Sequence, residues 1–263
     1  MIIDPKWRVL TVGDGDLSFS HALQARLSTG QLTASTYDNE QTIRNKYQDH
    51  ALDLISGTCS QYLSEFDVTS INSWQRLAQP RFDLVIFQFP LLPAFADQQA
   101  FAQQQYSINT LNRGLLRQFI DNAYRFALDP QGPMLCYITS KDVKPYCEWD
   151  LEGSLCVNSK MSYLGQHPFD ITQFPGYKIR NVDRDKHVKD TSGITYVFST
   201  KANPTLQEQL YIPRYLQDNH CSFCRAGPFH SEADAQAHKN SKKHRTMLTH
   251  QQHWQDFLAT YHS

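Results

Sequence analysis

The sequence predicts an α/β protein with a mostly parallel sheet, followed by a small second unit at the C-terminus. Apolar segments of strand length alternate with segments of helical spacing over residues 7–199, as in a parallel sheet that helices cover on both faces. A glycine-rich turn follows the first apolar segment, and a cysteine pair precedes a histidine pair near the C-terminus. A chain of 263 residues, 40% of them hydrophobic, suffices for one domain of about 200 residues and an appendage.

The expected strands and helices follow one another in chain order. We expect strands at 7–12, 32–37, 82–89, 133–139 and 195–199, and a less regular strand that ends near 65–67. Helical spacing covers 18–27, 40–47 and 106–128, and Ser18 is a plausible N-cap. Residues 82–89 (FDLVIFQF) are apolar almost throughout, which is typical of a central parallel strand.

Composition changes near residue 200 and suggests three parts. We predict a main domain at 1–200, a linker at 201–213 and the small unit with a terminal helix at 214–263. The net charge of the chain is −1, but residues 214–263 carry six Lys or Arg and four Asp or Glu. No apolar run is long enough for a transmembrane helix, and no signal peptide is expected at the N-terminus. We expect an intracellular protein, in the cytoplasm or, in a eukaryote, in the nucleolus.

The turn after the first strand predicts a ligand site. Gly13 and Gly15 lie between the first strand and the first helix, where α/β folds bind ligands and where glycine lets the backbone approach them. A tight structural turn would also use these residues. Asp38 ends the second strand, where a carboxylate can accept both hydroxyls of a ribose, and Asp67 follows the third strand, where it can meet an adenine amino group. Either acid alone could equally be a solvated loop residue.

The chemistry of the turn distinguishes between two nucleoside cofactors. Ser18 stands where a dinucleotide fingerprint has its third glycine, and Asp14 and Asp16 would repel a pyrophosphate. A sulfonium cation with an amino-acid tail suits these acids better, so the turn favours S-adenosylmethionine over a nicotinamide dinucleotide. The candidate cofactor-binding residues are Gly13, Asp14, Gly15, Asp16, Ser18, Asp38 and Asp67.

The ends of the fourth and fifth strands supply candidate catalytic residues. Gln88, Phe89 and Pro90 close the fourth strand, and there an amide can hydrogen-bond a base edge and a ring can stack on the base. The alternative is a buried strand that ends at a proline. Lys141 follows the fifth strand and could stabilise developing negative charge, or it could be an ordinary exposed lysine.

The C-terminal unit has the ligand spacing of a two-cysteine, two-histidine zinc site. Two residues separate Cys221 from Cys224, thirteen separate Cys224 from His238, and five separate His238 from His244. We expect both histidines on one helix, and a unit this small needs the metal to fold. His220, His230 and His250 are rival ligands that we interpret as surface residues. The basic residues beside the histidines are Lys239, Lys242, Lys243 and Arg245.

Taken together, several segments of the main domain resemble the eukaryotic 25S rRNA uridine-N3 methyltransferase family. The matching segments are 12–20 (VGDGDLSFS), 35–38 (STYD), 82–87 (FDLVIF), 89–90 (FP), Lys141 with 145–146 (PY) and Trp149, 174–177 (FPGY) and 195–198 (TYVF). The resemblance implies a Rossmann-like class I methyltransferase fold, S-adenosylmethionine as donor and a structured RNA, rRNA first, as substrate. The chain departs from the family after the fourth strand, where Asn-Phe-Pro-His is usual and Gln88-Phe89-Pro90-Leu91 stands here.

The stretch 238–244 (HKNSKKH) resembles zinc fingers of the U1 small-ribonucleoprotein and double-stranded-RNA-binding types. That resemblance implies RNA binding through shape and phosphates, with the four basic residues as contacts. Two alternatives remain at this point. The enzyme could methylate a protein or a small molecule with the finger as a protein adaptor, or the domain could be catalytically inactive and only bind RNA.

Overall fold

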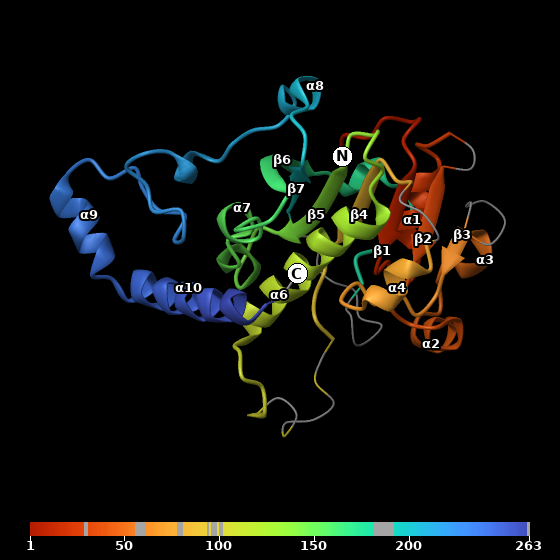
Figure 1. The fold of residues 1–263 in the computed structure, drawn as a ribbon, viewed down its shortest axis with the longest axis horizontal. Coiled ribbons are helices and arrows are strands. Elements are labelled where there is room, and N and C mark those ends of the chain that lie inside the picture. Colours follow the sequence, from red (N-terminus) through yellow and green to blue (C-terminus); the bar gives the residue numbers. More distant parts are fainter. Residues whose placement is uncertain are drawn as a thin grey trace.

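The computed structural model describes residues 1–28, 31–55, 61–77, 81–93, 95, 99, 102–180 and 192–261. One seven-stranded sheet forms its centre, with helices on both faces (Figure 1). The strands are β1 (Val9–Val12), β2 (Leu32–Ser35), β3 (Gln61–Leu63), β4 (Leu84–Gln88), β5 (Leu135–Lys141), β6 (Ser162–Phe169) and β7 (Gly193–Ser199). No helix in these ranges is long and apolar enough to cross a membrane.

The sheet confirms the predicted α/β class. Its strand order is β3-β2-β1-β4-β5-β7-β6, in which β1 to β5 run parallel and β7 lies antiparallel to both β5 and β6. The chain passes from β1 outward to β2 and β3 and then returns to pair β4 with the other side of β1. Ligands bind α/β sheets at such a reversal of strand order, so the ends of β1 and β4 mark the expected site.

Strand β6 was not predicted from the sequence. It lies at the edge of the sheet and contains Gly165, Gln166, His167 and Pro168 in succession. Its pairing with β7 shifts register between Tyr163 and Gly165. An edge strand tolerates proline and a bulge because one side of its backbone needs no partner in the sheet. The sequence of β6 therefore lacks the regular alternation of apolar and polar residues from which strands were predicted.

The described α-helices are α1 (Ser18–Gln24), α2 (Glu40–Lys46), α3 (Leu52–Ile55), α4 (Ile71–Gln75), α6 (Ile108–Asn122), α7 (Leu151–Ser154), α8 (Pro204–Gln207), α9 (Glu232–Lys239) and α10 (Lys242–Thr260). Helices α1, α2 and α6 match predicted segments with shorter bounds, whereas the short helices α3, α4, α7 and α8 were not predicted. The prediction of Ser18 as N-cap was wrong by one position. Leu17 caps α1 with φ of 65°, and the hydroxyl of Ser18 donates instead to Asp16 Oδ1 at 2.6 Å.

Alternate residues of the central strands face two separate cores. On one face, Val85 and Phe87 of β4 pack with Leu116 and Phe119 of α6. On the other face, residues of β4 that include Ile86 pack with residues of α1 and of the segment around 174. Residues with opposite parity along a strand point to opposite faces, and burial on both faces explains why 82–89 is almost wholly apolar.

The C-terminal part packs against the main domain, contrary to the expectation that a linker keeps two cores apart. Helix α10 ends beside α6 (Figure 1). Trp254 is fully buried, its ring lies 5.8 Å from the guanidinium of Arg113, and its Nε1 donates to the carbonyl of Ser154 at 3.3 Å. Phe257 meets α6 at Gly114, where a Cβ would approach its ring to 2.9 Å. The boundaries at 200 and 213 remain a prediction.

Candidate active site and zinc site

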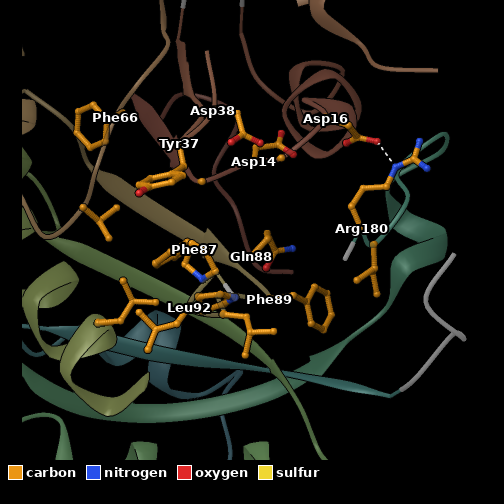
Figure 2. A pocket seen from close by; sticks show the side chains of 18 of the residues that line it. Asp14, Asp16, Tyr37, Asp38, Phe66, Phe87, Gln88, Phe89, Leu92 and Arg180 are labelled. Atoms are coloured by element: carbon orange, nitrogen blue, oxygen red, sulfur yellow. Dashed lines mark hydrogen bonds and ion pairs between the residues drawn. The ribbon is translucent and has the colours of Figure 1, made fainter. Parts of the chain in front are cut away.

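A cavity of about 440 Å³ opens at the carboxyl edge of the parallel strands (Figure 2). The segments that follow β1, β2, β3 and β4 line it, at 13–16, 37–38, 66–69 and 88–93. These segments are far apart in the sequence and meet because the carboxyl ends of parallel strands lie at the same edge of a sheet. The volume lies in the range of about 300–1,000 Å³ that is usual for small-molecule sites.

The glycine turn forms one wall of the cavity. Gly13 has φ of 62°, and a Cβ there would lie 2.6 Å from the ring of Phe87, so glycine is required for both backbone and space. Asp14 is buried, and its Oδ2 accepts the N–H of Ser20 at 2.6 Å. Burial and the nearby charge of Asp16 raise the pKa of the Asp14 carboxyl to about 7.

The two acids after β2 and β3 also line the cavity. Asp38 is half-buried, and its Oδ2 accepts from Lys46 Nζ at 3.0 Å. Asp67 is half-buried, and its Oδ1 accepts from the backbone N–H of Thr69 at 2.8 Å and from its hydroxyl at 2.7 Å. The hydrogen bonds hold both carboxylates in place at the rim, as a site that recognises a nucleoside requires.

The end of β4 combines an unpaired amide with strained backbone. Gln88 is only 9% exposed, and neither Oε1 nor Nε2 has a hydrogen-bond partner among the described residues. It lines the cavity beside Phe89 (Figure 2), and Pro90 also lines it. Phe89 has φ of 46°, which is unfavourable for an aromatic residue, and its ring packs at 5.6 Å on Phe169. Buried polar groups without partners and strained residues are concentrated at functional sites.

Two predicted site residues do not line the cavity that the described residues form. Ser18 lies behind the turn, where its hydroxyl donates to Asp16 and accepts the N–H of Lys178 at 3.1 Å. Lys141 ends β5 with its ammonium 5.4 Å above the ring of Tyr146, and burial lowers its pKa. Both side chains contact other protein groups rather than the cavity.

The sequence did not reveal a segment after β6 that completes the wall. Tyr177, Lys178, Ile179 and Arg180 all line the cavity. Arg180 Nε donates to Asp16 Oδ2 at 2.5 Å (Figure 2). The motif at 174–177 (FPGY) was a signal of this segment, but no spacing rule relates it to a turn more than 150 residues earlier.

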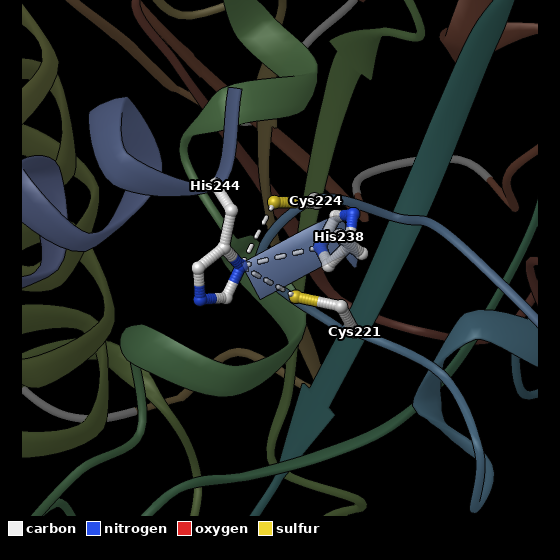
Figure 3. A group of neighbouring side chains, drawn as sticks. All are labelled: Cys221, Cys224, His238 and His244. Carbon is white, nitrogen blue, oxygen red and sulfur yellow. Dashed lines mark hydrogen bonds between the residues drawn. The ribbon is translucent and has the colours of Figure 1, made fainter. Parts of the chain in front are cut away.

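The four predicted zinc ligands meet in the C-terminal part (Figure 3). Their ligand atoms all lie within 4.8 Å of one another. His244 Nδ1 lies 3.4 Å from Cys221 Sγ, 3.6 Å from Cys224 Sγ and 3.2 Å from His238 Nε2. A tetrahedral zinc ion, with bonds of about 2.3 Å to sulfur and 2.0 Å to nitrogen, separates its ligands by roughly 3.3–3.8 Å, so the donor set fits zinc.

The prediction that both histidine ligands share one helix was wrong. His238 lies on α9 and His244 on α10. The side chain of Ser241 caps α10 by accepting the N–H of His244 at 3.1 Å, because serine at an N-cap satisfies a free N–H of the first turn. The break turns the second histidine toward the cysteines.

The finger is fixed to the main domain through Arg225, the residue after Cys224. Its guanidinium contacts Asp142 at 2.7 Å, Glu152 at 2.9 Å and the hydroxyl of Tyr196 at 3.0 Å. The side chain of Glu152 is only 1% exposed. A buried carboxylate needs such a partner, so this ion pair joins the segment that carries Cys221 and Cys224 to the main domain.

The four basic residues of the finger are all exposed, but they are not equivalent. Lys243 Nζ donates to the carbonyl of Cys224 at 2.6 Å and so stabilises the knuckle. Lys239 ends α9, while Lys242 and Arg245 lie in the first turn of α10. The finger therefore presents a basic edge at the end of α9 and the start of α10.

Comparison with known proteins identifies a family and several relatives of this chain. The profile of the family described as "rRNA (uridine-N3-)-methyltransferase BTM5-like" matches residues 10–181. An uncharacterized protein of Arabidopsis thaliana is 26% identical over 189 residues, which are 67% of this chain and 87% of that protein. Heavy metal-associated isoprenylated plant protein 41 of the same plant is 28% identical over 179 residues, which are 67% of this chain but 33% of that protein.

Among solved structures, a 30S ribosomal A1408 methyltransferase from an uncultured bacterium is similar over 76% of this chain and 96% of its own. Its sequence identity is 11% and its TM-score is 0.38. The family match covers the glycine turn, the acids and the end of β4, and it ends one residue after Arg180. The chain therefore belongs to the BMT5-like rRNA (uridine-N3-)-methyltransferase family and is an S-adenosylmethionine-dependent RNA methyltransferase.

Proposed function

We propose that the chain methylates N3 of a uridine in rRNA, in the cavity at the ends of β1 and β4. The unpaired amide of Gln88 carries this proposal. Its oxygen and nitrogen are buried at the cavity wall without partners among the described residues, and leaving such groups unpaired costs free energy. A uracil, whose edge carries both N–H and carbonyl groups, can satisfy them.

The donor occupies the half of the cavity beside the glycine turn. Asp38 accepts the ribose hydroxyls, Asp67 faces the adenine amino group, and the turn at 13–16 lies along the amino-acid end. S-adenosylmethionine supplies an electrophilic methyl group on a sulfonium, and the acids at the turn favour that positive charge. The base then enters from the side of Gln88 and Phe89.

The proposed role of Gln88 follows from the chemistry of uracil. Attack by N3 forms the nitrogen–methyl bond and breaks the sulfur–methyl bond, while the N3 proton passes to solvent water and S-adenosylhomocysteine remains. Negative charge spreads onto the uracil carbonyls as that proton leaves. An N–H of the Gln88 amide that donates to a carbonyl oxygen stabilises the charge. Phe89 positions the base, and Pro90 ends the strand. Lys141 lies outside the cavity lining and has no role in the proposed chemistry.

The finger is proposed to hold one structural zinc on Cys221, Cys224, His238 and His244 and to bind the phosphates of the substrate RNA. The domain before residue 214 is net acidic and is a poor surface for a polyanion. Lys242 and Phe257 are fifteen residues apart on α10, roughly 22 Å along the axis at 1.5 Å per residue. An RNA that reaches both the finger and α6, whose Leu115 lines the cavity, must span a comparable distance.

The substrate also bears on location. rRNA is made in the nucleolus of a eukaryotic cell, so we propose a nuclear or nucleolar location in place of the cytoplasmic one expected from the sequence.

Donor binding tests the proposed cavity. Asp38→Ala should weaken binding of S-adenosylmethionine, measured by calorimetry, by about 1.5–3 kcal/mol for each charge-assisted hydrogen bond lost. Asp53→Ala is the matched control, because Asp53 is an exposed carboxylate that pairs with Arg44 outside the cavity lining. Equal affinities of both variants and the wild type would remove Asp38 from the donor site.

RNA binding tests the finger. The combined Lys239→Ala, Lys242→Ala and Arg245→Ala variant spares Lys243, which holds the knuckle. It should weaken RNA binding strongly, and its log–log salt dependence should be shallower because fewer counterions are released. The control variant replaces Lys6, Arg44 and Lys160 by Ala, which removes the same positive charge from surfaces outside the finger. Equal salt slopes for both variants would mean that the finger contacts protein instead.

A further inference from the structure

The segment that follows β6 lies across the glycine turn and supplies a cation to it. Phe174 and Tyr177 pack their rings against Phe19 of α1, at 5.0 and 5.1 Å between centroids. The N–H of Lys178 donates to the hydroxyl of Ser18 at 3.1 Å. These contacts hold Arg180 against the turn, where its side chain is 11% exposed.

The acids of the turn accept hydrogen bonds from the start of α1. Asp14 Oδ2 accepts the N–H of Ser20 at 2.6 Å, and Asp16 Oδ1 accepts the N–H of Ser18 at 3.0 Å. The first N–H groups of α1 are therefore bound by protein carboxylates, which also repel another anion. The amino-acid end of S-adenosylmethionine carries a carboxylate, and the proposed orientation of this methyl donor brings that carboxylate close to the turn.

Three cations line the described cavity wall, and their places differ. Lys46 pairs with Asp38 after β2, beside the site proposed for the ribose. Lys178 forms an ion pair with Asp49 and is 51% exposed. Arg180 contacts both Asp16 and Asp49 and is the most buried of the three beside the glycine turn. Arg180 contacts Asp16 of the turn directly, and its side chain is the least exposed of the three.

We propose that Arg180 binds the carboxylate of the methyl donor's amino-acid end, and that Asp16 and Asp49 hold the guanidinium in position for it. This inference rests on the proposed function, since it deepens the donor site. A guanidinium offers several N–H donors in one plane and can hold more than one carboxylate at a time. A hydrogen bond from a guanidinium to a ligand carboxylate is charge-assisted and therefore strong. The donor would thereby join the segment after β6 to the turn after β1.

Two ligands that differ in one group test the proposal on the wild-type chain. S-adenosylmethionine and its decarboxylated analogue share the sulfonium, the ribose and the adenine, and only the first has a carboxylate. Calorimetry should show at least tenfold weaker binding of the decarboxylated analogue. Equal affinities would overturn the proposal without any variant. Failure of the wild type to bind either ligand would instead refute the proposed function.

Variants of the chain distinguish direct contact of Arg180 with the ligand carboxylate from a structural role of Arg180 in holding the turn. Arg180→Gln should weaken S-adenosylmethionine at least tenfold and change the affinity of the decarboxylated analogue less than threefold. Arg44→Gln, which breaks an exposed Arg–Asp pair on α2, should change neither. An equal loss of both ligands in Arg180→Gln would mean that Arg180 only supports Asp16, and no loss of either would place the carboxylate elsewhere.

Discussion

Replacing Gln88 by methionine should make the protein more stable and less active. The side-chain amide of Gln88 is nine-tenths buried, and both of its polar atoms lack partners among the described residues. Each buried polar group left unpaired costs about 1–3 kcal/mol, and methionine has a similar length without these groups. We expect the free energy of unfolding to rise by about 1–3 kcal/mol, which corresponds to about 2–4 °C in Tm for each kcal/mol in a chain of this size.

Gln166→Met is the matched control for this prediction. Gln166 is also buried, but its Nε2 donates to the hydroxyl of Tyr211 at 3.1 Å and its Oε1 accepts from Tyr163 at 2.9 Å. The same substitution should therefore destabilise there. Urea unfolding measures both variants, and transfer of labelled methyl to RNA should fall about 10²–10³-fold in Gln88→Met alone, as for loss of one transition-state donor. If both variants lose equal stability, the Gln88 amide is already satisfied and the reasoning fails.

Three further predictions concern the metal, the docked helix and pH. The chain should contain about one zinc by elemental analysis, with Cys224→Ser losing it and His220→Ala retaining it; zinc retained by Cys224→Ser would disprove the ligand set. Trp254→Ala should lower the free energy of unfolding by about 3–5 kcal/mol, because the ring is fully buried between α10 and the main domain; an unchanged urea midpoint would mean that α10 is not docked. Burial raises the pKa of Asp14 to about 7, so the folded state keeps a proton that the unfolded state loses near pH 4, and stability falls from about pH 4 to 7. Asp14→Asn should therefore lose less stability than the wild type between pH 5 and pH 8; parallel losses would contradict the shift.

Local patterns in the sequence were sufficient to predict the parallel strands and the four residues of the Cys/His cluster. Residues 82–89 are apolar because β4 is buried on both faces, and metal geometry restricts ligand spacing to a few values. Gly13 was recognisable because Gly13 and Gly15 lie directly between a strand and a helix. Each of these signals lies within a short stretch of sequence.

Features that depend on tertiary contacts were not predictable in the same way. Arg180 reaches Asp16 across more than 160 residues, and no local pattern records that contact. The docking of Trp254 on the main domain has the same origin. The break between α9 and α10 did have a local signal, since Asn240 and Ser241 are a favourable C-cap and N-cap pair, but the histidine spacing suggested one continuous helix.

Nucleoside analysis of RNA after reaction with the purified chain tests the central claim most directly. rRNA incubated with the protein and isotope-labelled S-adenosylmethionine would be digested to nucleosides and examined by mass spectrometry. We expect labelled 3-methyluridine, and little of it with the Gln88→Met variant. Label on another base or on another atom of uridine would contradict the proposed chemistry, and label found only on protein would contradict an RNA substrate.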